Sequence, residues 1–91
     1  MTKIKVKTII WEEWNVKHIK KHSVTESEVR STALNFTYHE KTHNGRYLIV
    51  GRCGLRILTL IVRRLESGKY YLVTARDSSK KERKKLYEKE N

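Results

Sequence analysis

The chain has 91 residues, 34% of them charged and 37% hydrophobic, which is enough for one small core and therefore one domain, residues 1–91. Lys and Arg total 21 against 10 acidic residues, and the net charge of +11 favours a polyanionic partner. The longest apolar run, 55–62, contains Arg56 and is far shorter than the roughly 20 residues of a membrane span. Cys53 is the only cysteine, so no intramolecular disulfide is possible. Without a recognisable signal peptide, we expect a cytoplasmic protein with no membrane partner.

The N-terminal part predicts one strand followed by two helices. Residues 4–10 alternate in the period of two that is typical of a half-buried strand. Thr25 and Glu28 form a capping box for the second helix, which we expect to end near Leu34 and to bury Val29, Ala33 and Leu34. From residue 12 the first helix is predicted by a face at spacings of three and four, formed by Trp11, Trp14, Asn15, His18, Ile19 and His22.

The remainder of the chain predicts strands and one last helix. We expect strands at 36–40, 46–52, 55–64 and 69–76, with turns at 43–45, 51–54 and 66–68. The first of these strands is expected at an edge and the third at the centre of the sheet. Strict alternation in the last strand would place Arg76 on the same face as Tyr70 and Leu72, opposite Ala75.

The last helix begins at a capping box of Ser79 and Glu82 and runs from Lys80 to about Lys89, burying Leu86 with Tyr87 beside it. The predicted fold is therefore α+β. It has an N-terminal strand, two helices, an antiparallel sheet of three to four strands and a C-terminal helix.

Arginines and tyrosines are interleaved on the predicted strands. Guanidinium groups bind phosphate and aromatic rings stack on bases, so this composition predicts a surface for single-stranded RNA. The alternative for any single arginine is that it keeps a sheet edge soluble. The residues concerned are Arg46, Arg52, Arg56, Arg63, Arg64 and Arg76, with Tyr47, Tyr70 and Tyr71.

The last helix is strongly basic, with Lys80, Lys81 and Arg83 in its first part. These residues either extend a phosphate-binding track or form a solvated helix face.

The histidines form two pairs with the i, i+4 spacing that can chelate a metal, His18 with His22 and His39 with His43. Neither pair has a Cys or Asp close in sequence to complete a ligand set, so we expect no metal and no cofactor. We expect half-buried core positions for His18 and His22. The sequence has no Ser-His-Asp order, glycine-rich phosphate loop or paired carboxylates, which leaves acyl transfer, nucleotide hydrolysis and glycoside hydrolysis without support.

Two blocks of the sequence resemble the BrnT family of type II toxin–antitoxin toxins. The first is WEEWNVKHIKKHSV at 11–24, and the second comprises GRYLIVGR at 45–52, RILTLIVRR at 56–64 and YLVTARDSSKKERKKLYEKE at 71–90. Ser23 stands where the family has a glycine, so the first helix is expected to end without the usual left-handed residue.

The resemblance implies a RelE/ParE-like fold and a metal-independent endoribonuclease that inhibits translation. It also implies a ribbon-helix-helix antitoxin that binds the toxin in an oligomeric complex. A nuclease of this kind helps the RNA 2′-hydroxyl to attack its own phosphate. In this chain the catalytic candidates are Arg76, Arg52, Tyr87 and His22, with Arg46, Arg56, Lys80, Lys81 and Arg83 as RNA-binding candidates.

Each catalytic candidate has a structural alternative. Arg76 would pair with Asp77 or Glu82, Tyr87 would cap the core, and His22 would hold the helix end. The alternative function is a non-catalytic domain that binds nucleic acid or an antitoxin.

Overall fold

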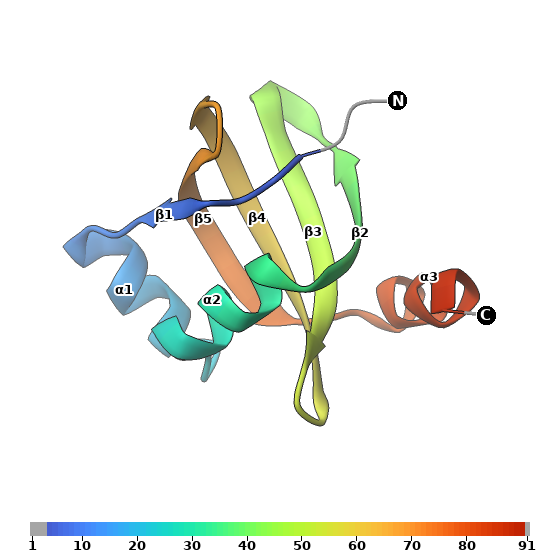
Figure 1. Ribbon diagram of the computed structural model, residues 1–91. Coiled ribbons are helices and arrows are strands. Elements are labelled where there is room, and N and C mark those ends of the chain that lie inside the picture. Colours follow the sequence, from blue (N-terminus) through green and yellow to red (C-terminus); the bar gives the residue numbers. More distant parts are fainter. Residues whose placement is uncertain (1–3, 91) are drawn as a thin grey trace.

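The computed structural model describes residues 4–90 and contains three helices, five strands and a 3₁₀ turn in these residues (Figure 1). In chain order the elements are β1 (Thr8–Ile10), α1 (Glu13–Lys20), α2 (Glu26–Leu34), β2 (Phe36–Lys41), the 3₁₀ turn (His43–Gly45), β3 (Arg46–Cys53), β4 (Arg56–Glu66), β5 (Lys69–Asp77) and α3 (Lys80–Glu90). The predicted α+β class and the order of the elements are confirmed. None of the helices in the described part is long and apolar enough to cross a membrane.

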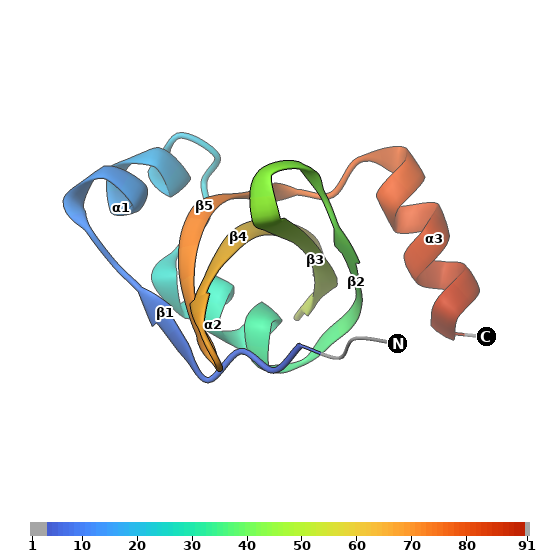
Figure 2. The ribbon, with the colours of Figure 1, turned by 90° about the horizontal axis from the view of Figure 1, so that it is seen from above.

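The five strands form one mixed sheet in the order β1-β5-β4-β3-β2. Strands β2 to β5 are antiparallel neighbours, as predicted, and β1 adds a short parallel edge strand beside β5. The sheet therefore has one more strand than the upper limit of the antiparallel prediction. Figure 2 shows the sheet curled around α2, with α1 and α3 outside the curl. We call the side of the sheet that faces α2 the inner face and the other side the outer face.

The main core lies on the inner face, where Val29 of α2 packs with Ile49, Leu58, Leu60 and Leu72 of the sheet. A smaller cluster on the outer face holds Leu86 of α3 against Tyr38 and Val50. Leu86 is fully buried and Tyr87 is 47% exposed, so the apolar contact of α3 with the sheet is made mainly by one leucine. The outer face is therefore only partly covered.

Both predicted capping boxes are present. The backbone N–H of Glu28 donates to the hydroxyl of Thr25 at 3.1 Å, and the Thr25 N–H donates to the Glu28 carboxylate at 3.0 Å. At the start of α3 the Ser79 N–H donates to the Glu82 carboxylate at 2.8 Å, and the Glu82 N–H donates to the Ser79 hydroxyl at 3.2 Å. Each box satisfies backbone donors that a helix start leaves unpaired.

A bulge in β5 corrects the predicted faces of this strand. Leu60 pairs with Ala75 and Val62 pairs with Leu72, so the intervening register shift leaves one extra residue in β5. Ala75 consequently joins the buried inner face, and Arg76 turns to the outer face. The prediction was wrong because strict alternation ignores a bulge, which reverses the faces of every residue beyond it.

The end of α1 also differs from the prediction. Ser23 has φ of 57°, so the left-handed position exists and a serine occupies it. The Ser23 N–H donates to the Lys20 carbonyl and the Val24 N–H to the Ile19 carbonyl, which closes the helix. Left-handed backbone costs a non-glycine residue roughly 1–2 kcal/mol. Ser23 therefore adopts the left-handed conformation that a glycine provides at this position in the family that the sequence resembles.

The buried face of α1 is narrower than predicted. Asn15 and Ile19 are buried, but Trp14 is 55% exposed. His18 is half-buried and His22 is exposed, so the half-buried position predicted for His22 was wrong. In α2, Val29 and Ala33 are buried as predicted and Leu34 is 64% exposed.

The expected turn at 51–54 is shorter in the structure. Strand β3 continues to Cys53, and only Gly54 and Leu55 form the turn. Gly51 lies inside the strand. A glycine is needed there because a Cβ atom would stand 2.8 Å from the Cα of Phe36. This glycine marks a close approach of two backbones rather than a turn.

Candidate functional site

The start of α3 carries a polar cluster on the outer face of the sheet, formed by Arg76, Glu82, Thr59 and Ser78 (the helix-start cluster). Arg76 donates from Nη1 and Nη2 to the two oxygens of Glu82 at 2.8 and 3.0 Å. The Thr59 hydroxyl donates to the same carboxylate at 2.8 Å and shares a 2.7 Å hydrogen bond with Ser78. Thr59 lies directly opposite Arg76 across β4 and β5. The β5 bulge is what brings Arg76 to this position.

The environment of Glu82 keeps it ionised. Burial by itself raises the pKa of this carboxyl, but hydrogen bonds from Arg76, the Ser79 N–H and Thr59 outweigh burial and lower its pKa to about 2. The hydrogen bond to Glu82 likewise raises the pKa of Arg76. The anion position that Arg76 and the first turn of α3 create is thus occupied by the protein's own carboxylate. Glu82 is a weak base and serves to position Arg76.

Arg76 nevertheless retains donors. Its Nη1 also reaches the Asp77 carbonyl at 3.3 Å, and its Nε–H makes no hydrogen bond within residues 4–90. The Arg76 side chain is 35% exposed. A neighbouring hollow of about 320 Å³ between the sheet and α3 is lined by Tyr38, Glu40, Leu48, Ser79, Lys81, Glu82 and Lys85. Lys81, one of the RNA-binding candidates, lies at this hollow.

A second cluster lies at the end of α3 and contains Arg52, Tyr87 and Glu90 (the helix-end cluster). Arg52 donates from Nε and Nη2 to the Glu90 carboxylate at 2.6 and 2.9 Å, and its guanidinium lies 5.7 Å from the centroid of the Tyr87 ring. The ion pair lowers the pKa of Glu90 and raises that of Arg52. Two of the catalytic candidates are therefore in contact, and α3 connects them to the helix-start cluster.

The other candidates are distributed around the molecule. Arg56 lies on the inner face, where it donates to the Ser23 carbonyl at 2.8 Å and to the carboxylates of Glu28 and Asp77 at 3.0 Å. His22 is exposed just beyond the end of α1, where its ring lies edge-on to that of His18, which in turn is stacked on Trp14.

The remaining RNA-binding candidates lie along α3 and at the far end of β3. Lys80 and Lys81 are exposed on α3, and Arg83 is held by the Ser78 carbonyl at 2.6 Å. Arg46 is exposed at the start of β3.

Sequence reasoning missed Thr59 and Ser78 as part of the site. Their contacts with Glu82 depend on strand register, so no pattern along the chain signals them. Glu82 carried a signal, because it was predicted to complete the capping box, and it does so while holding Arg76.

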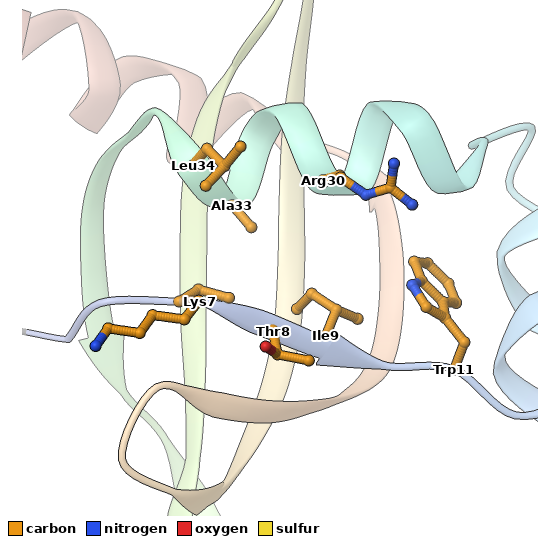
Figure 3. A pocket seen from close by; sticks show the side chains of 8 residues that line it. Lys7, Thr8, Ile9, Trp11, Arg30, Ala33 and Leu34 are labelled. Atoms are coloured by element: carbon orange, nitrogen blue, oxygen red, sulfur yellow. The ribbon is translucent and has the colours of Figure 1, made fainter.

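Two further features lie outside the helix-start and helix-end clusters. A hollow of about 210 Å³ lies between β1 and α2, where Figure 3 shows Ile9, Ala33 and Trp11 around it. The rings of His18 and His22 are 5.4 Å apart in an edge-on arrangement. Among residues 4–90, no group of three His, Cys, Asp or Glu side chains is placed to hold a metal ion.

These features define a small basic α+β domain whose arginine-bearing outer face is crossed by its last helix. The same fold occurs in the Brucella abortus ribonuclease toxin BrnT, which matches 82% of this chain over 100% of its own length, with a TM-score of 0.66 and 23% sequence identity. The predicted BrnT fold is thereby confirmed, and the sheet has one strand more than the three to four that were predicted for it. No protein-family model matches the chain, and no curated protein is significantly similar to it in sequence.

Proposed function

We propose that this protein is a BrnT-like endoribonuclease toxin of a type II toxin–antitoxin system, which cleaves RNA in the cytoplasm without a metal ion and so inhibits translation. The observation that carries the proposal is that the domain has the fold of an entire ribonuclease toxin. The net charge of +11 supports RNA as the substrate, because phosphate contacts dominate the affinity for nucleic acids.

The proposed reaction needs only groups that move protons and stabilise charge. The RNA 2′-oxygen attacks the adjacent phosphorus, the bond from phosphorus to the 5′-oxygen breaks, and a 2′,3′-cyclic phosphate and a 5′-hydroxyl are formed. The 2′-hydroxyl loses a proton and the leaving 5′-oxygen gains one.

We assign the stabilisation of the developing phosphate charge to Arg76 and Arg52. Arg76 would act through the N–H donors that Glu82 leaves free. Tyr87 is the candidate for proton transfer at the leaving oxygen. Arg56 is bound on the inner face and His22 lies in the row of rings with His18 and Trp14, so in our proposal they contact other parts of the RNA. Lys80, Lys81 and Arg83 extend the basic track along α3.

A cognate antitoxin of the ribbon-helix-helix class is the proposed protein partner. An acidic segment of such a partner would match the basic outer face and cover the exposed Tyr87. Co-expression with a neighbouring antitoxin gene should then relieve growth arrest, and copurification of the two proteins as an oligomer measures the complex directly.

One observation favours the second candidate function, a domain that binds RNA or an antitoxin without cleavage. Arg76 and Arg52 are each already bound by a carboxylate through two nitrogens. Cleavage by Arg76 therefore has to use its remaining donors, whereas simple binding does not require them.

The test is RNA cleavage by the purified chain in EDTA, with analysis of the product ends. We expect cyclic phosphate and 5′-hydroxyl ends, and a loss of about 100-fold in rate for Arg76→Ala, since one charge-assisted contact to a transition state contributes roughly 3 kcal/mol. Arg30→Ala is the matched control, because Arg30 is an exposed arginine of α2. Binding without cleavage would support the second function, and activity restored only by a divalent metal would overturn the proposed metal independence.

A further inference from the structure

A second basic site lies on the outer face, at the opposite end of the strands from the helix-start cluster. A hollow of about 280 Å³ there is lined by Trp14, Arg46, Arg63, Tyr71 and Val73, and we call it the Trp14 pocket. Arg46 and Arg63 are direct partners across β3 and β4, and Arg63 and Tyr71 are partners across β4 and β5. Three strands and α1 thus contribute to one pocket.

The two arginines of the Trp14 pocket lack the carboxylate partners that the candidate site has. Arg76, Arg52 and Arg56 are each paired with at least one acid. Arg46 and Arg63 are exposed and make no ion pair within residues 4–90. Two like charges opposite each other on a sheet destabilise it unless an anion lies between them. The pair is therefore best satisfied by an external anion.

The aromatic rings of the pocket are held in place and remain accessible. Trp14 is 55% exposed, and its ring is stacked on His18 with centroids 4.9 Å apart and an interplanar angle of 10°. The Arg63 guanidinium lies 5.6 Å from the centroid of Tyr71. Burial and the nearby Glu12 carboxylate raise the pKa of Tyr71, so this phenol stays neutral. A pre-positioned indole beside two unpaired guanidinium groups suits a ligand with both an anion and a flat ring.

We propose that the Trp14 pocket binds one nucleotide of single-stranded RNA, with the phosphate between Arg46 and Arg63 and the base stacked on Trp14. This inference rests on the proposed function for its choice of RNA. It adds a binding site whose lining includes none of Arg76, Arg52 and Tyr87.

The position of the pocket fits an RNA strand that also reaches Arg76. Arg63 and Thr59 lie four residues apart on β4, and Thr59 is opposite Arg76. At about 3.3 Å per residue, the two positions are about 13 Å apart along the same face. An RNA strand bound at the Trp14 pocket would thus cross the uncovered part of the outer face towards the helix-start cluster.

The first test measures binding of a 2′-O-methyl RNA oligonucleotide, which cannot be cleaved because its 2′-oxygens are blocked. We expect Arg46→Gln and Arg63→Gln each to weaken binding about tenfold and to reduce the slope of affinity against salt. Arg64→Gln is the matched control, because Arg64 is the next residue of β4, is also exposed and lies opposite Tyr70 on the inner side. Equal losses for all three variants would overturn the proposal, because binding would then follow net charge alone.

The second test asks whether a base contacts Trp14. The chain has two tryptophans, so Trp11→Phe leaves Trp14 as the only indole emitter. We expect the RNA to quench its fluorescence, an abasic oligonucleotide to leave it unchanged, and Trp14→Ala to weaken binding about tenfold. Equal quenching by polyglutamate would overturn the proposal in favour of an acidic protein ligand.

The two tests are independent of catalysis. If the protein cleaves RNA but the three arginine variants lose RNA affinity equally, the proposed function stands and the Trp14 pocket is refuted as a binding site. A chain that never cleaves RNA but loses affinity only at Arg46, Arg63 and Trp14 would lose the proposed nuclease activity and retain the pocket.

Discussion

Glu82→Gln should destabilise the protein more than any other single loss of a carboxylate. The variant keeps the shape of the side chain but removes the charge that balances the partly buried Arg76. The Glu82 side chain is only 15% exposed, and its carboxylate accepts from Arg76, Thr59 and the Ser79 N–H. In glutamine an NH₂ group replaces one of the two carboxylate oxygens and would face the donors that this oxygen accepts from. The variant therefore loses hydrogen bonds as well as the charge.

The pKa of Glu82 sets the magnitude. Its fall from 4.5 to about 2 corresponds to about 3 kcal/mol of stabilisation of the charged form. Screening at the 35% exposed Arg76 reduces the expected loss to about 2 kcal/mol. Because the folded-state pKa is lower than the unfolded one, this stabilisation is complete above the unfolded pKa and is lost as the pH falls towards 2. In a domain of this size the loss corresponds to roughly 8–16 °C in Tm.

Urea unfolding of the wild type and the variant at neutral pH and at about pH 3 measures this directly. The difference between the two proteins should be largest at neutral pH and should shrink in acid. Glu13→Gln is the control, because Glu13 pairs with Lys17 at the surface and should contribute less than about 0.5 kcal/mol. If both variants lose the same small amount at neutral pH, the helix-start cluster does not stabilise the fold as described.

Three further changes test the fold by urea unfolding. Ser23→Gly should stabilise the protein by about 1 kcal/mol, because φ is 57° there, and a loss of stability would show that the serine side chain outweighs its backbone strain. Asn15→Leu should cost about 3 kcal/mol, because the buried amide donates to the carbonyls of Ile10 and Leu72 and accepts from the Glu12 N–H; a change below 1 kcal/mol would contradict this role. Gly51→Ala should cost about 2 kcal/mol, because its Cβ would stand 2.8 Å from a backbone carbon of β2, and an unchanged free energy of unfolding would refute that close approach.

The sequence by itself determined the features that depend on neighbours along the chain. The capping boxes join residues three positions apart, and the turn at 43–45 needs only an Asn and a Gly that accept positive φ. The order of the strands and helices follows from hydrophobic periods, which are also local. For this reason the α+β class and most element boundaries were predicted within one or two residues.

The faces of the elements depended on more than the period. Asn15 is buried in α1 while Trp14 is exposed, because the Asn15 amide reaches carbonyls of β1 and β5 that were not visible as partners in the sequence. The β5 bulge likewise arises from pairing with β4, and it decides whether Arg76 faces the core or α3. Side-chain alternation predicts such faces only as far as the first irregularity.

The partners of the arginines were decided by the tertiary structure alone. Arg52 and Glu90 are 38 residues apart, Arg56 and Glu28 are 28 apart, and the Trp14 pocket joins α1 to the far ends of three strands. Composition predicted an RNA-binding set of basic residues, but it could not distinguish those bound by carboxylates from those left unpaired. The distinction depends on Coulomb energies over a few ångströms between side chains, and such distances exist only once the sheet has its register and α3 its place on the outer face.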